Sequence, residues 1–125
     1  MLHAQKRPAE KWGAGNWQIG VDIIHGRFRA SYGFEPFTMN KSIAELQAAN
    51  IFVSNGSFVR QGQLIGNLIY GGLGGAHMDF DVIGNGGSDR LTESLCPAVY
   101  FTSQAYTSVL NLIHKFNSSW AICYT

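Results

Sequence analysis

Alternating apolar and polar positions predict paired strands in the first third of the chain. Residues Trp17 to His25 alternate weakly and are rich in β-forming types, so they predict a strand. Gly26 interrupts this pattern, and Arg27 to Phe34 predict a second strand that forms a hairpin with the first. Residues 1–16 carry Pro8 and show no periodicity, which indicates a loose N-terminal arm.

The middle of the chain predicts several short elements. Residues 42–45 read Ser-Ile-Ala-Glu, the form of a capping box, so a short surface helix is expected from Ile43 to about Ala49. Short strands are expected at 51–53 and 58–59, separated by an Asn-Gly turn pair. The apolar run from Leu64 to Tyr70 is interpreted as a buried strand.

Residues His77 to Ile83 show the cleanest alternation in the chain. His77, Asp79 and Asp81 share one face of the expected strand, while the residues between them are apolar. Further on, apolar residues at helical spacing predict a helix from Gln104 to Phe116, capped by Thr102 or Ser103. A polar loop is expected at 84–94, and 120–124 are interpreted as a closing edge strand.

Many short strands separated by glycines are typical of a β-sandwich or barrel. The 15 glycines and the 13% of aromatic residues fit this mainly β class. A length of 125 residues suits one domain, which is expected to span 17–125 with a short surface helix and a C-terminal helix. Apolar residues make up 46% of the chain, which argues against disorder.

Charge and apolar runs exclude two partner classes. The formal net charge is +1, so the electrostatic pattern of a nucleic-acid-binding protein is absent. No apolar run approaches the roughly 18 residues that a membrane-spanning helix needs. The polar N-terminus is not a signal peptide, which leaves a cytoplasmic protein or a chain without its native N-terminus. In the second case the expected location is extracellular or periplasmic.

The chain has two cysteines, Cys96 and Cys123, on either side of the expected C-terminal helix. They lack the neighbouring Cys or His residues of a structural zinc site. Two alternatives remain open, a disulfide that closes a loop of 27 residues and a pair of buried free thiols.

Two adjacent motifs carry the most specific information. Residues 56–66 read Gly-x-x-Val-x-x-Gly-Gln-x-Ile-Gly, and a glycine-rich loop at 71–75 leads to Ala-His-Met-Asp-Phe-Asp-Val at 76–82. Lipoyl and biotinyl carrier domains have a similar glycine pattern, but they need a lysine that is absent between Lys41 and Lys115. Over residues 51–83, the order and spacing of both motifs resemble the lysostaphin/LytM-type zinc endopeptidases.

The resemblance implies a fold, a groove and a partial active site. The fold is a β-sandwich or flattened barrel of the duplicated hybrid motif type, with a groove for peptide or glycan. His77 matches a catalytic histidine of the family, and Asp79 stands where the family has a zinc-binding histidine. The family's Tyr-x-His-Leu strand corresponds to residues 32–35, where Phe34 or Glu35 replaces the histidine. Residues 18–22 resemble its His-x-x-x-Asp ligand motif, with glutamine in place of histidine, but they lie too close to residue 56. We therefore expect the ligand-bearing segment to be absent.

Two functions follow as hypotheses. The first is a degenerate, non-catalytic domain that binds cell-wall peptide, glycan or a protein partner without a cofactor. The second is a zinc-dependent metallopeptidase or a truncated form of one, and its zinc site needs three protein ligands and an open position. The candidate residues are His77 and Glu35 for catalysis, Asp79 for metal, and Asp81, Tyr32 and His25 for the groove. The structural alternatives are a solvated strand face for the β-strand acids, a strand-end carboxylate for Glu35 and a hairpin-end histidine for His25.

Overall fold

The computed structural model describes residues 2–12, 15–72, 74–83 and 94–123. The chain forms two compact units, residues 1–94 and residues 95–125, where a single domain over 17–125 was expected. Within the described ranges, none of the helices has the length and apolar character needed to cross a membrane.

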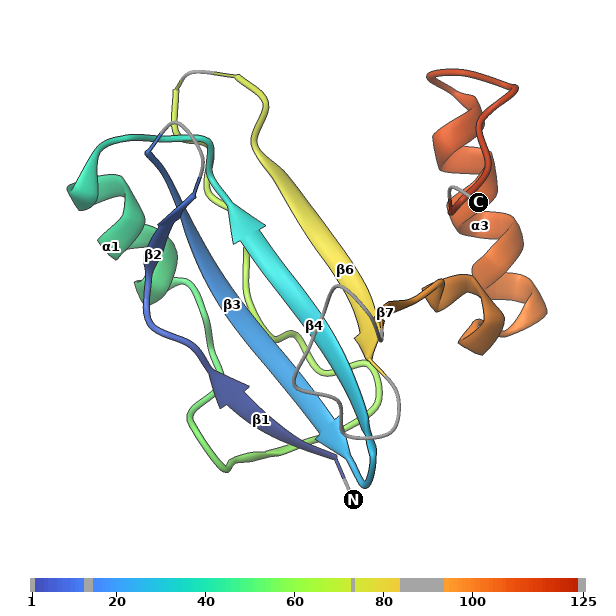
Figure 1. The fold of residues 1–125 in the computed structure, drawn as a ribbon, viewed down its shortest axis with the longest axis horizontal. Coiled ribbons are helices and arrows are strands. Elements are labelled where there is room, and N and C mark those ends of the chain that lie inside the picture. Colours follow the sequence, from blue (N-terminus) through green and yellow to red (C-terminus); the bar gives the residue numbers. More distant parts are fainter. Residues whose placement is uncertain (1, 13–14, 73, 84–93, 124–125) are drawn as a thin grey trace. The chain divides into compact units, whose positions relative to one another are not determined.

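An antiparallel sheet dominates the first unit (Figure 1). Its strands pair in the order β5-β1-β3-β4-β6, and β2 pairs with one end of β3. This pairing is an open path among the described residues, so the mainly β class is confirmed without closure into a barrel. The strands are β1 (Leu2–Lys6), β2 (Glu10–Trp12), β3 (Asn16–His25), β4 (Phe28–Glu35), β5 (Phe58–Val59) and β6 (His77–Ile83), and β7 (Ser94–Leu95) lies at the boundary of the units.

The hairpin of β3 and β4 forms as the sequence predicts. Its register pairs Val21 with Tyr32, and the tight turn contains Gly26 at a φ of 57°, a backbone conformation that glycine adopts without strain. β6 is also confirmed and lies against β4. The long pairs β3–β4 and β4–β6 therefore form the centre of the sheet.

The loose N-terminal arm expected for residues 1–16 was wrong, because part of this segment belongs to the sheet. β1 lies between β3 and β5, and Ala4 is fully buried in the core. The pairing joins His3 to Ile24, about 20 positions away in sequence. A five-residue strand held by such distant partners leaves little local periodicity to read.

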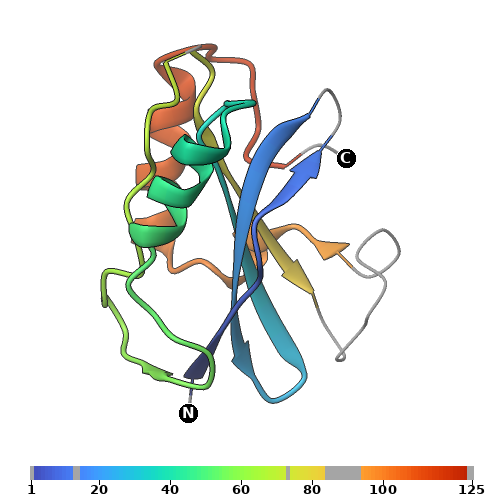
Figure 2. The same ribbon diagram turned by 90° about the vertical axis from the view of Figure 1, so that its left-hand side faces the viewer.

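Helix α1 (Lys41–Ala49) begins two residues before the helix that the sequence predicted. Its N-cap is Asn40, whose side-chain oxygen accepts from the Ser42 amide at 2.9 Å, so the expected capping box does not form. Both α1 and the segment that follows it lie on one side of the sheet (Figure 2). The buried residues of the helix are Ala44 and Gln47.

The strands expected at 51–53 and 64–70 are also absent. Only an isolated bridge joins Ile51 to Gly66, and Leu64 and Tyr70 are exposed. The buried side chain of Gln47 satisfies the backbone here: its Nε2 donates to Asn67 O and its Oε1 accepts from Ile69 N, both at 2.8 Å. The side-chain amide of Gln47 thus makes the hydrogen bonds that a neighbouring strand would otherwise make.

The core of the first unit lies between the apolar face of the sheet and the segment around α1. β3 contributes alternate residues to this face, and β4 and β1 add their own apolar positions. The buried cluster consists of Ala4, Ile19, Val21, Ile23, Phe34, Ile51 and Val53. The opposite face of the same strands carries the polar side chains considered below.

The second unit contains a short 3₁₀ helix η1 (Pro97–Tyr100) and helix α3 (Ser103–His114). Thr102 caps α3 by accepting from the Ala105 amide at 3.1 Å, as predicted. Cys96 and Cys123 form a disulfide with a Cα–Cα distance of 5.9 Å, which decides between the two cysteine alternatives. The edge strand expected at 120–124 is not formed over 120–123, and residue 124 lies outside the described residues, as does most of the expected loop at 84–94.

Candidate functional site

The register of β4 and β6 brings the chemically active residues together on the polar face of the sheet. Glu35 lies directly opposite His77, Gly33 opposite Asp79, and Ser31 opposite Asp81. The alternation predicted for β6 is therefore confirmed. This register brings Glu35, His77 and Asp79 together in a small cluster at the ends of the two strands, and the side chain of Gln18 lies over Gly33.

Close contacts hold this cluster. His77 Nε2 lies 2.6 Å from Glu35 Oε2 and 3.9 Å from Asp79 Oδ1. The other ring nitrogen, Nδ1, is 2.7 Å from the carbonyl oxygen of Gly75. A carbonyl can only accept, so Nδ1 carries the hydrogen, and Nε2 faces the two carboxylates.

The electrostatics of the cluster favour proton sharing. Burial raises the pKa of Glu35, and the hydrogen bond and negative charge of Asp79 raise it further against the opposing effect of His77. The hydrogen bond to the Gly75 carbonyl raises the pKa of His77, and the charges of Glu35 and Asp79 act in the same direction. Protonation of His77 is therefore favoured by the two carboxylates, and loss of the proton from Nε2 would leave this nitrogen able to act as a ligand.

The donor set of the cluster fits a divalent cation such as zinc. One ligand atom from each of Glu35, His77 and Asp79 can be chosen so that all lie within 4.8 Å of one another. Ligands on tetrahedral zinc lie about 3.4 Å apart, given bond lengths near 2.0–2.2 Å. The side chains of His77 and Asp79 are 50% and 57% exposed, so small rotations can close the difference. The Gly75 contact orients the ring in the way that outer-shell carbonyls orient zinc-binding histidines.

A second polar group lies further along the same face, around the buried Asp22. Ser31 Oγ donates to Asp22 Oδ1 at 2.6 Å, and Arg7 Nε lies 3.5 Å from Oδ2. Arg29 approaches the same carboxylate at 3.9 Å. The Arg7 guanidinium lies over Gly20, where any Cβ would collide with it. Asp22 therefore holds Arg7, the residue that follows β1, against β3. The sequence around Asp22 does not reveal this role.

Gln18 and Asp22 are not placed to bind one metal ion together. Four positions along β3 separate Gln18 from Asp22, about 13 Å in an extended strand. Gln18 lies over Gly33 near the cluster, whereas Asp22 is engaged by arginines.

Two of the residues expected in the groove, Tyr32 and His25, do not belong to the cluster on the polar face. Tyr32 points to the apolar face and packs against Phe80 with ring centroids 4.8 Å apart, because strand alternation places it opposite to Ser31 and Gly33. Burial raises the pKa of its hydroxyl. His25 is exposed at the far end of β3, opposite Phe28. Only Asp81 shares the face of the cluster, beside Ser31.

Comparisons with known proteins do not assign this chain to a family. Protein-family models, curated proteins and solved structures all give no match. The features that bear on its function are therefore the geometry of the cluster and the motifs of residues 51–83.

Proposed function

We propose that this chain is a lysostaphin-like module that binds cell-wall peptide or glycan on the polar face of β3, β4 and β6 without hydrolysing it. The observation that carries the proposal is the cluster of Glu35, His77 and Asp79 on an open strand face. The motif order in residues 51–83 supplies the ligand class and the proposed duplicated hybrid motif fold.

The chemistry of the cluster suits such a ligand. Carboxylates accept hydrogen bonds from peptide amides and sugar hydroxyls, and His77, whose two ring nitrogens contact Gly75 and Glu35, holds the Glu35 carboxylate in place. Glu35 is 16% exposed, whereas His77 and Asp79 reach solvent, so a ligand can approach from above the sheet. A protein partner with exposed amides would use the same groups.

Zinc-dependent peptide hydrolysis is the second candidate function. It is favoured by one observation, that three residues of the right donor types can converge while the Gly75 carbonyl fixes the His77 ring. Glu35, His77 and Asp79 would hold the ion, which when bound would supply Lewis-acid chemistry. Glu35 was a catalytic candidate from the sequence, and the geometry makes it the third possible ligand.

Sedimentation with purified, insoluble peptidoglycan tests the first function. We expect the full chain to co-sediment, and the double substitution Glu35→Gln and Asp79→Asn to weaken this binding about tenfold, because charge-assisted hydrogen bonds are lost. The matched control is Arg27→Gln, which changes charge at the distant hairpin turn. Failure of the wild-type chain to sediment would contradict the proposed ligand class.

The same incubation separates the two functions when the released amino groups are measured. A binding module releases none above the level without protein, with or without added zinc. A zinc-dependent rise that a chelator abolishes would replace the proposed function with the second candidate.

Equilibrium dialysis followed by metal analysis tests the zinc site independently of any substrate. If the second function holds, we expect about one zinc per wild-type chain at neutral pH, and an affinity loss of at least roughly tenfold for His77→Ala or Asp79→Ala, because each substitution removes a ligand. Asp81→Ala, on the same strand and face, should retain the ion. The raised pKa of His77 means that protons compete with zinc, so the affinity should fall as the pH is lowered.

Two results would reject this site. One is the absence of retained zinc, which would remove the hydrolase and leave the binding module. The other is equal loss in Asp81→Ala, which would show that zinc binds diffusely to the acidic strand.

A further inference from the structure

The apolar side of the sheet contains a cavity that the proposed function does not use. Its volume is about 730 Å³, within the range of pockets that hold small ligands. Tyr32, Phe34 and Met78 form its floor on β4 and β6, and residues 59–68 form its opposite wall. Strand alternation places it on the face opposite to His77 and Asp79.

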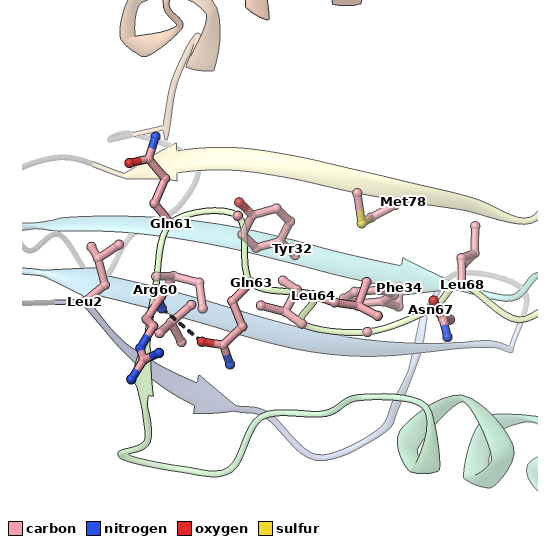
Figure 3. A pocket seen from close by; sticks show the side chains of 15 residues that line it. Leu2, Tyr32, Phe34, Arg60, Gln61, Gln63, Leu64, Asn67, Leu68 and Met78 are labelled. Atoms are coloured by element: carbon pink, nitrogen blue, oxygen red, sulfur yellow. Dashed lines mark hydrogen bonds between the residues drawn. The ribbon is translucent and has the colours of Figure 1, made fainter.

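The cavity is elongated along the strands. Figure 3 shows Leu2 and Arg60 at one end and Asn67 and Leu68 at the other, with Leu64 between them. Two lining residues mark the length of the floor, Ile23 on β3 and Phe34 on β4. Phe34 pairs with Ile19, so the floor extends along β3 from position 19 to position 23. Four residues of extended strand correspond to about 13 Å, enough for a short extended peptide.

The polar groups of the lining are of few types. Arg60 is its one charged side chain, and within the described part of the chain its guanidinium forms no ion pair. Gln61, Gln63 and Asn67 add side-chain amides, each able to donate and to accept. Gln63 Oε1 accepts from the Arg60 amide at 2.9 Å, which holds these two residues together at one end.

Apolar side chains remain exposed around the cavity. Leu64 is 61% and Met78 is 47% exposed, although both line a hollow in which apolar surface would be buried by a ligand. An occupant with apolar side chains would remove this surface from water. Backbone amides in the occupant would match the three side-chain amides, and an anionic end would match Arg60.

We infer that this cavity binds a short apolar peptide by its C-terminal end, with the free carboxylate at Arg60 and the apolar side chains against Tyr32, Phe34 and Met78. Charge complementarity selects the carboxylate, because the lining contains a cation and no acidic residue. The side-chain amides on the wall favour an extended peptide backbone over a simple alkyl chain, because an alkyl chain cannot form hydrogen bonds with them.

Fluorescence anisotropy with a labelled Ala-Leu-Leu-Phe peptide tests the inference on the full chain. The free-carboxylate peptide should bind roughly tenfold more tightly than the same peptide with a C-terminal amide, as expected for one charge-assisted contact. Arg60→Gln should reduce this ratio to about one, whereas Arg27→Gln, which removes an arginine at the hairpin turn, should leave it unchanged. Met78→Asp, at an exposed position of the floor, should weaken both peptides.

Three outcomes would overturn the inference. These are no binding of either peptide, an unchanged preference for the carboxylate in Arg60→Gln, and binding of dodecanoate in place of the peptide. Binding of peptide to the Glu35→Gln, Asp79→Asn variant should remain at the wild-type level, because those residues lie on the other face. The result is therefore independent of the cell-wall experiment.

Discussion

Replacing Asp22 with alanine is expected to lower the free energy of unfolding by about 3 kcal/mol. The carboxylate is 1% exposed and accepts from Ser31 Oγ at 2.6 Å. Its other oxygen lies 3.5 Å from Nε of Arg7, a residue in the segment between β1 and β2. Removing one partner of a buried ion pair leaves the other charge uncompensated. We place the loss at the lower end of the usual range because Arg7 and Arg29 both reach water.

Urea denaturation followed by circular dichroism would measure this change. Asp22→Asn should cost less than alanine, because an amide oxygen can still accept from Ser31 while the charge is lost. The matched control is Glu45→Ala, which breaks the exposed pair that Glu45 forms with Lys41 at 3.6 Å. That change should stay within about 0.5 kcal/mol. Equal effects at positions 22 and 45 would show that the buried pair does not anchor β1.

The elements that the sequence predicted correctly are those with strong local signals. The β3–β4 hairpin has a glycine turn, β6 alternates without interruption, and α3 combines a threonine cap with helical spacing. Each signal lies within about ten residues and is read directly from neighbouring positions. The faces of His77, Asp79 and Asp81 followed from the same alternation.

The errors arise where distant contacts decide the structure. β1 exists because β3 and β5 pair with it, and no property of residues 2–6 alone requires this. The apolar run at 64–70 resembles a buried strand, yet its backbone bonds to a glutamine side chain. In the site, Tyr32 and Asp81 were expected in the same groove, but strand alternation puts their side chains on opposite faces of the sheet.

Gln47→Ala is the second substitution with a large expected effect, a loss of about 2–4 kcal/mol in unfolding free energy. The side chain is fully buried on α1. It donates to Asn67 O and accepts from Ile69 N, both at 2.8 Å. Alanine would leave both backbone groups without a partner and open a cavity between the helix and this segment. The loss should appear in urea denaturation and as faster hydrogen exchange at the Ile69 amide.

Gln47→Glu separates the hydrogen bonds from the volume, because the two side chains have nearly the same size. The introduced carboxylate can accept from Ile69 N, but when ionised it faces the carbonyl oxygen of Asn67 without a proton to donate. Burial and this repulsion should raise its folded-state pKa above the value of about 4.3 in the unfolded chain. A raised folded pKa makes protonation stabilising, so the penalty should be small at low pH and grow as the pH rises through the folded pKa. A penalty independent of pH, with unchanged exchange at Ile69, would show that packing alone holds α1 against residues 67–69.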